Sequence, residues 1–240
     1  MSERKNHNFL TRTVTGLVFV AVVLAMTMIG RGSYLLLLLL VWCCCSMEFI
    51  ALTRSRGVKW GGVAYILLCM AAMWFFPAIG DGMSGHSRLW NEWHGLAGEW
   101  PAGWDMRIAP AFMTVVWAND VFAYLVGVAL GRHKMAPLIS PHKSWEGFAG
   151  GIVGATVVAA VVGRFWAGGE VWLWALFGVV VAWAAVAGDL AESRFKRAAG
   201  VKDSGRLLPG HGGLLDRFDA TLGAVPVAFV FLLVTTHFSR

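Results

Sequence analysis

Seven runs of mostly apolar residues alternate with short polar segments along this chain of 240 residues. About 20 apolar residues in a helix are enough to cross the hydrocarbon core of a bilayer. Each run has roughly that length, so the pattern predicts an all-α fold, a polytopic integral membrane bundle of about seven transmembrane helices. The predicted spans cover residues 13–30, 33–51, 60–79, 108–130, 147–167, 171–191 and 219–237.

The first two spans are separated only by Arg31 and Gly32. A link this short predicts either a tight helical hairpin or one re-entrant element. The polar and basic residues 1–12, followed by an apolar run, resemble a signal peptide. A second apolar run follows at once, however, and no small-residue cleavage site stands out. We therefore expect an uncleaved first span.

The composition supports a membrane location. Apolar residues make up 58% of the chain and charged residues only 14%, with a mean hydropathy of +0.64, whereas a soluble domain carries about 25% charged residues. The formal net charge is +6. Because the basic residues lie in short gaps between apolar runs, we expect anionic headgroups and phosphates as partners, and no nucleic acid. The four cysteines all lie inside apolar runs without ligand spacing, which indicates apolar filler.

The distribution of Lys and Arg predicts the orientation. With the N-terminus in the cytoplasm, the cytoplasmic segments carry fifteen of these residues and the outer segments five. The main cytoplasmic loops are then 131–146 and 192–218, on the inner side of a bacterial-type plasma membrane. The outer loop 80–107 carries four tryptophans, which favour the membrane–water interface. The chain thus divides into N-terminal spans with this outer loop, 1–107, and a catalytic membrane domain, 108–240.

Small residues recur four apart at the start of the fifth span, with Gly147 and Gly151 on one line and Gly150 and Gly154 on another. Such spacing lets a second helix approach closely, so it predicts helix packing at this face. Membrane enzymes with close-packing glycines often form dimers, which leaves a homodimer as an open expectation.

The long polar stretch of the C-terminal half runs from Ser193 to Asp219. We call it the polar island. It holds six of the chain's twenty Lys and Arg residues, three aspartates, His211 and five glycines. Cations neutralise phosphate oxygens, glycines let backbone N–H groups approach them, and carboxylates bind Mg²⁺. The polar island therefore indicates a site for a phosphate-rich, metal-bound ligand. An ordinary positive loop is the alternative, but it does not account for the glycines and aspartates.

Three aspartates predict a metal site at one membrane edge. Asp216 and Asp219 are three residues apart and share a helix face, and Asp189 lies near the cytoplasmic end of the preceding span. Three carboxylates repel each other unless a cation lies between them, and Mg²⁺ prefers hard oxygen ligands that it shares with phosphates. The alternative is that Asp216 and Asp219 form structural salt bridges with Arg217 and nearby lysines.

Two further acids lie within predicted spans. Asp120 is at the middle of the fourth span beside Asn119, where a carboxylate is costly and therefore suggests a function. We expect it to line a polar cavity. Glu48 closes the second span next to a basic loop, and we expect Arg54 or Arg56 to pair with it.

Three segments of the chain carry recognisable motifs. They are Asn119-Asp120-x-Phe122-Ala123-Tyr124; Ser140-Pro141-x-Lys143-Ser144-x-Glu146-Gly147; and Ser193-x-Phe195-Lys196-Arg197, continued by Lys202-Asp203-x-Gly205 and Pro209-Gly210-His211-Gly212-Gly213-Leu214-x-Asp216-Arg217-Phe218-Asp219. Together they resemble the signature of the CDP-diacylglycerol synthases, also called phosphatidate cytidylyltransferases. The resemblance covers roughly residues 117–222, and the first hundred residues share only the presence of membrane spans.

The resemblance implies an enzyme that transfers the cytidylyl group of CTP to phosphatidic acid, giving CDP-diacylglycerol and pyrophosphate in phospholipid biosynthesis. It implies Mg²⁺ as the cofactor, with a second cation as an open alternative. The residues expected to be catalytic are Asp189, Asp216, Asp219 and Lys196, of which the three aspartates hold the metal. The residues expected to bind substrate are Asp120, Ser140, Lys143, Ser193, Arg197, Lys202, Asp203, His211, Gly212 and Gly213.

Two other functions remain open at this point. One is a CTP-dependent cytidylyltransferase or kinase that acts on another lipid, such as an isoprenoid or ether lipid. The other is an ion-coupled transporter with Asp120 and Asp189 along its ion path. The glycine-rich end of the polar island argues against a transporter, since an ion path has no use for a phosphate-binding loop.

Overall fold

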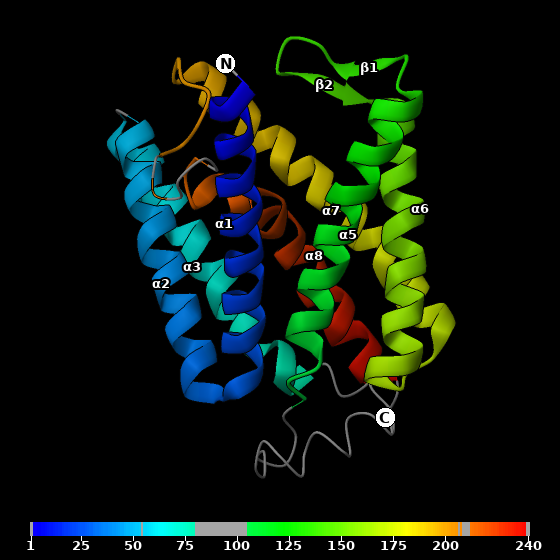
Figure 1. Ribbon diagram of the computed structural model, residues 1–240. Coiled ribbons are helices and arrows are strands. Elements are labelled where there is room, and N and C mark those ends of the chain that lie inside the picture. The colour runs from blue at the N-terminus through cyan, green and yellow to red at the C-terminus, as the bar shows by residue number, and fades with distance from the viewer. Residues whose placement is uncertain (1, 54, 80–104, 206, 208–211, 239–240) are drawn as a thin grey trace. The chain divides into compact units, whose positions relative to one another are not determined.

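The computed structural model describes residues 2–53, 55–79, 105–205, 207 and 212–238. Its long helices are α1 (Ser2–Ile29), α2 (Arg31–Leu52), α3 (Arg56–Ile79), α5 (Ile108–Leu130), α6 (Trp145–Val162), α7 (Val171–Ala198) and α8 (Leu215–Phe238) (Figure 1). Within this part of the chain six helices are long and apolar enough to cross a membrane, and Thr13–Ile29 in α1 is a shorter apolar segment. The prediction of an all-α membrane bundle is confirmed, and each predicted span coincides with a helix.

The chain folds as two compact units. The first contains Met1–Met70 and Phe195–Phe218, and the second contains Ala71–Arg194 and Asp219–Arg240. The helices α3, α7 and α8 each contribute residues to both units. The functional division expected at residue 107 remains a prediction.

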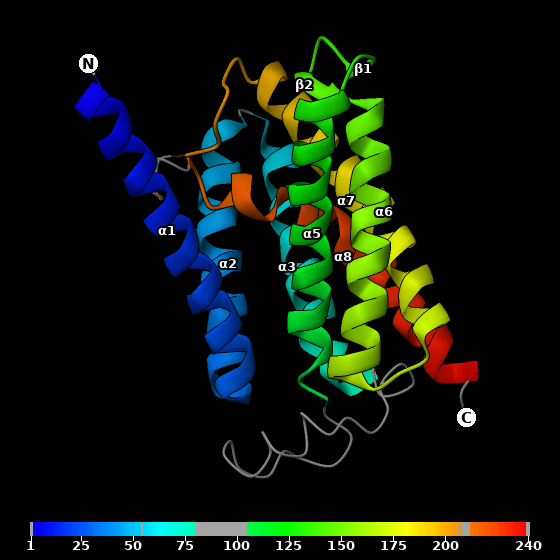
Figure 2. The same cartoon turned by 45° about the vertical axis from the view of Figure 1, so that its right-hand side comes forward.

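In the first unit α1 and α2 form a helical hairpin with Gly30 between them, as Figure 2 shows. Whether this hairpin crosses the bilayer or is one re-entrant element stays a prediction. One aromatic pair joins α2 to the end of α7 in this unit, and another joins α1 to the start of α8. Phe49 stacks on Phe195 with ring centroids 4.8 Å apart, and Phe19 meets Phe218 edge-on at 6.0 Å.

In the second unit α5 and α6 lie side by side (Figure 1). The predicted small-residue face makes this contact. A Cβ atom on Gly147 would lie 2.7 Å from the carbonyl oxygen of Ala123, and one on Gly151 would lie 2.7 Å from Oδ1 of Asn119. The expected helix packing is thus confirmed. Because these glycines are used within the chain, they give no support to the homodimer, which stays a prediction.

An antiparallel hairpin of two short strands joins α5 to α6. It consists of β1 (Lys134–Ala136) and β2 (Ser140–Ser144), with Lys134 opposite Ser144. The last residue of β2 also begins the next helix, since Oγ of Ser144 accepts a hydrogen bond from N–H of Gly147 at 3.1 Å. A side-chain oxygen at this position satisfies a free N–H group of the first helical turn. The end of β2 is thereby fixed relative to α6.

An aromatic cluster fills the core of the second unit. Phe177 of α7 packs against Phe112 of α5, Trp174 and Phe231 of α8, with ring centroids 6.4, 5.6 and 5.5 Å away. Phe76 of α3 meets Phe112 edge-on at 5.2 Å. Four helices of this unit therefore share one core.

Most of the predicted outer loop, residues 80–104, lies outside the described residues. Its last part contains a buried ion pair, in which Nε and Nη2 of Arg107 donate to the two carboxylate oxygens of Asp105 at 2.8 Å. Arg107 therefore balances Asp105 inside the protein and is not a free surface charge of the kind on which the orientation count rests.

Candidate active site

A cavity of about 250 Å³ opens in the second unit between β2, α5, α6 and α7. Its lining combines polar and charged side chains from three of these elements with apolar ones. The polar members are Asn119, Asp120, Tyr124, His142, Lys143, Ser144 and Asp189. Two of the three motif segments thus contribute to one cavity.

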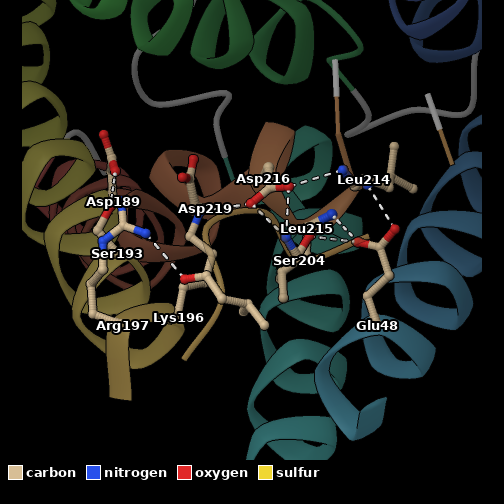
Figure 3. A network of polar contacts seen from close by, with 12 residues as sticks. Glu48, Asp189, Ser193, Lys196, Arg197, Ser204, Leu214, Leu215, Asp216 and Asp219 are labelled. Carbon is tan, nitrogen blue, oxygen red and sulfur yellow. Dashed lines mark hydrogen bonds and ion pairs between the residues drawn. The ribbon is translucent and has the colours of Figure 1, made fainter. Parts of the chain in front are cut away.

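Lys143 is the cation of this cavity. It lies in β2, and its ammonium group forms an ion pair with the carboxylate of Asp189 on α7. The same carboxylate accepts a hydrogen bond from Oγ of Ser193, one helical turn later, at 3.2 Å (Figure 3). The structure therefore brings together Lys143 and Ser193, which belong to separate motifs, and Asp189, which the sequence placed in the predicted metal site.

Asn119 and Asp120 form the wall of the cavity on α5. The side chain of Asn119 is fully buried, and its Nδ2 lies 3.5 Å from Oδ1 of Asp120. Among the residues that the structure describes, Oδ1 of Asn119 has no hydrogen-bond partner. A buried acceptor without a partner is unfavourable. This oxygen faces α6, since a Cβ atom on Gly151 would lie 2.7 Å from it.

Asp219 belongs to a group of carboxylates in the second unit. The carboxylates of Asp189 and Glu192 are near enough to interact with it electrostatically, and Glu192 also contacts it directly. Glu192 was not among the expected site residues. Its position one helical turn after Asp189 would have pointed to it, because residues three apart share a helix face.

A close crossing of α7 and α8 brings these carboxylates together. A Cβ atom on Gly188 would lie 2.5 Å from Cα of Gly223 and 2.8 Å from the carbonyl oxygen of Asp219. Only glycine allows two backbones to approach this closely. Since Gly188 directly precedes Asp189, the crossing places the two aspartates on adjoining helix surfaces.

The donor chemistry of this group fits a cation such as Mg²⁺, which prefers carboxylate oxygens. Three acids with one ion-paired lysine also leave negative charge for a cation to neutralise. In the described parts of the chain, however, no group of three or more His, Cys, Asp or Glu side chains is arranged so that it could hold a metal ion. A cation would therefore need ligands from the substrate or a rearrangement of these side chains.

Asp216 has a different environment, in the first unit. Its Oδ1 accepts from the ammonium group of Lys196 at 2.6 Å, and both side chains are almost fully buried. It also accepts from the backbone N–H groups of Ser204, at 2.9 Å, and Gly213, at 2.9 Å (Figure 3). Both oxygens of this expected metal ligand are thus occupied by protein donors.

The two glycines expected to contact phosphate, Gly212 and Gly213, are required by the protein's own packing. Gly212 has a φ of +83°, and a Cβ atom there would lie 2.9 Å from Oδ2 of Asp216. A Cβ atom on Gly213 would lie 2.1 Å from Oγ of Ser204. The N–H group of Gly213 already donates to Asp216, so it is not open to a phosphate oxygen in this structure.

The other expected substrate-binding residues lie in varied environments. Ser140 pairs with Ala136 in the hairpin. Arg197 is exposed, and its Nη1 donates to the carbonyl oxygen of Val201 at 3.1 Å. Lys202 and Asp203 are exposed. His211 lies outside the described residues.

Comparison with known proteins gives two kinds of match. The model of the cytidylyltransferase family matches residues 60–235. A phosphatidate cytidylyltransferase of Mycobacterium leprae is 49% identical over 120 residues, which are 50% of this chain and 38% of that protein. One of Staphylococcus epidermidis is 46% identical over 122 residues, which are 50% of this chain and 47% of that protein. The chain therefore spans less than half the length of the curated relatives it matches.

Proposed function

Because this chain belongs to the cytidylyltransferase family, we propose that it transfers the cytidylyl group of CTP to phosphatidic acid, forming CDP-diacylglycerol and pyrophosphate. The names of the two bacterial relatives support this choice of lipid. The observation that carries the proposal is the cavity in which Lys143, Asp189 and Asp120 meet within a set of membrane-spanning helices. A site with a cation, carboxylates and an adjacent lipid phase suits a substrate that is both a phosphate and a lipid.

The proposed reaction exchanges one phosphorus–oxygen bond for another. An oxygen of the phosphatidate phosphate attacks the α-phosphorus of CTP, and the bond from that phosphorus to the bridging oxygen of the β-phosphate breaks. Pyrophosphate leaves with that bridging oxygen. A phosphate monoester is already anionic at neutral pH, so the attacking oxygen needs no strong general base. Positioning and charge neutralisation then supply most of the rate.

Lys143 provides neutralising charge in the cavity. Its ion pair with Asp189 holds the ammonium group beside the cavity until a substrate phosphate competes for it. Ser193 orients Asp189 through the hydrogen bond between their side chains. Ser140, at the other end of β2, fixes the hairpin that carries Lys143.

The polar island supplies further groups for phosphate oxygens. Arg197 and Lys202 are exposed cations, and we assign them to the CTP phosphates. Asp203 and His211, which are near them in the sequence, are assigned as further polar groups that contact the substrate. Lys196 acts through its bond to Asp216, which fixes the segment around Gly212 and Gly213. Lys196, expected from the sequence to be catalytic, is therefore a positioning residue in this proposal.

Mg²⁺ is the cofactor that this donor set fits. Asp189 and Asp219, with Glu192, are the residues that would hold it. When bound, a divalent cation neutralises phosphate oxygens and stabilises the charge that develops at the α-phosphorus. Asp216 joins these ligands only if it gives up its bonds to Lys196 and the backbone. A second cation remains part of the proposal.

Pyrophosphate release by the purified protein tests the proposed function. We expect release from CTP only when phosphatidic acid and Mg²⁺ are both present. Replacing phosphatidic acid by an isoprenoid phosphate, an isoprenoid alcohol or an ether lipid should abolish most of the release. Equal or faster release with one of these lipids would assign the chain to a different acceptor.

The orientation prediction can be tested at the two ends of α7. In a variant without its native cysteines, Val201→Cys should react with an impermeant maleimide only from the cytoplasmic side, and Glu170→Cys only from the outer side. Both positions are exposed and flank the helix Val171–Ala198. The excess of Lys and Arg in the predicted cytoplasmic segments is the physical reason. Reversed labelling would contradict the proposed cytoplasmic location of the polar island.

Asp120→Asn should raise the apparent KM for phosphatidic acid more than the KM for CTP. Asp120 lines the same cavity as Lys143, so its charge helps to orient the lipid headgroup or a water molecule bound to it. Steady-state kinetics with each substrate varied in turn measures the two constants. If the role of Asp120 is structural, Asn is tolerated and Asp120→Leu lowers the melting temperature. A rise in the KM for CTP alone contradicts both roles.

A further inference from the structure

Glu48 makes a set of contacts that its sequence neighbours did not suggest. It lies one turn before the end of α2, beside a basic loop. Its Oε1 accepts from the backbone N–H of Leu214 at 3.0 Å, and its Oε2 accepts from the backbone N–H of Leu215 at 2.8 Å (Figure 3). Oε2 also accepts from Oγ of Ser204 at 2.9 Å. All four residues belong to the first unit.

The contacts with Leu214 and Leu215 cap a helix. α8 begins at Leu215, and the first N–H groups of a helix have no partner within it. A carboxylate at this end satisfies these donors and interacts favourably with the helix dipole. The cap usually comes from a residue just before the helix. Here it comes from a residue 167 positions away from Leu215.

The backbone encloses this carboxylate closely. A Cβ atom on Gly205 would lie 2.4 Å from Oε1 of Glu48, and one on Gly213 would lie 2.4 Å from Oε2. Two glycines of the polar island are therefore explained by the approach of Glu48. The next residue, Phe49, stacks on Phe195, which directly precedes Lys196. The end of α2 thus contacts the polar island in residues 193–205 and in residues 212–219.

Glu48 and Asp216 bind the same two segments. Ser204 donates its N–H to Asp216 and its hydroxyl group to Glu48. On the other side, Gly213 donates to Asp216, whereas Leu214 and Leu215 donate to Glu48. Two carboxylates from different helices therefore hold residue 204 and residues 213–215 together, nine or more positions apart in sequence.

We propose that Glu48 is a positioning residue for the transfer reaction, which fixes the phosphate-binding groups of the polar island through Ser204 and the start of α8. This inference rests on the proposed function. Glu48 lies outside residues 60–235, to which the family model corresponds, so it does not belong to the matched motifs. It acts through the side chain of Ser204 and the backbone of Leu214 and Leu215, and it does not itself bind the substrates.

Glu48→Gln tests this role with little change in size. The amide keeps one oxygen acceptor, but its NH₂ group faces donors and cannot replace the second oxygen. We expect the apparent KM for CTP to rise about tenfold, the scale on which one hydrogen bond to a charged group is lost. The KM for phosphatidic acid should stay unchanged. Ser204→Ala removes one donor to Glu48 and should change the KM for CTP in the same direction by a smaller factor.

Glu170→Gln is the matched control, because Glu170 is an exposed acid just before α7 and outside the polar island. It should leave both constants unchanged. A Glu48→Gln variant with both KM values like those of the unmodified protein would overturn the proposal. So would an equal rise in both constants, because a role confined to the phosphate-binding groups of the polar island affects CTP alone.

Hydrogen exchange keeps the test independent of activity. In the absence of substrates, Glu48→Gln should speed amide exchange in peptides that contain Leu214 and Leu215, and Glu170→Gln should not. Unchanged exchange at these positions overturns the inference about Glu48 whatever the kinetics. Failure of the unmodified protein to form a lipid product from CTP would instead overturn the proposed function.

Discussion

Asp219→Asn is expected to lower the turnover number by at least about 100-fold, the scale on which an active-site electrostatic contact is lost. Asn keeps the size and polarity of the side chain but removes the charge that a divalent cation requires. Asp219 interacts with two further acids, Asp189 and Glu192, so the substitution removes one of three clustered charges. Steady-state kinetics at saturating CTP and phosphatidic acid measures the effect.

A binding measurement separates a metal role from a structural one. Added Mg²⁺ should raise the melting temperature of the unmodified protein, because a ligand that binds only the folded state stabilises it. In Asp219→Asn this rise should be lost. Glu170 lies just before the first residue of α7, whereas Asp189 and Glu192 lie in the second half of that helix. Glu170→Gln should therefore retain both the turnover and the response to Mg²⁺. Normal turnover in Asp219→Asn would contradict a metal-binding role and favour the alternative that Asp219 is a structural residue.

Lys196→Met should reduce the free energy of unfolding by about 3 kcal/mol, because it leaves the buried carboxylate of Asp216 without its cation. The carboxylate keeps its two backbone donors, Ser204 and Gly213, so we expect the lower end of the usual range. Denaturant or thermal unfolding in detergent micelles measures the loss.

The double variant Lys196→Met/Asp216→Asn is the informative control for this prediction. Removing the uncompensated charge should recover part of the stability, which a loss of packing around Lys196 alone would not. Arg197→Met changes the adjacent cation, which is exposed, and should have little effect on stability. An unfolding midpoint for Lys196→Met equal to that of the unmodified protein would show that the ion pair contributes nothing.

The helices could be predicted because an apolar run of about 20 residues has few alternatives in a membrane protein. The ends of the helices were harder to predict. The apolar run was expected to end at residue 191, but α7 continues to Ala198, so its last residues belong to the polar island. The hairpin of β1 and β2 was missed because three residues from Lys134 to Ala136 are too few to carry an alternating pattern.

The candidate site could be predicted as a set of residues but not as a set of contacts. A motif pointed to Lys143 and the clustering of acids at one membrane edge pointed to Asp189, and the structure pairs them. The partners of Asp216 and Glu48 depend on tertiary packing, which has no local signal. Gly213 shows the difference, because a glycine that leaves room for phosphate and one that leaves room for Glu48 look the same in sequence.

If the proposed reaction takes place, the α-phosphorus of CTP becomes bonded to the phosphate of phosphatidic acid. Purified protein in vesicles that contain phosphatidic acid is supplied with Mg²⁺ and with CTP labelled at either the α- or the γ-phosphate. Label from the α-phosphate should enter the lipid fraction in an amount equal to the pyrophosphate released, and label from the γ-phosphate should not. Lipid labelled from the γ-phosphate would identify a kinase, and unlabelled lipid with both forms of CTP would contradict the proposed transfer.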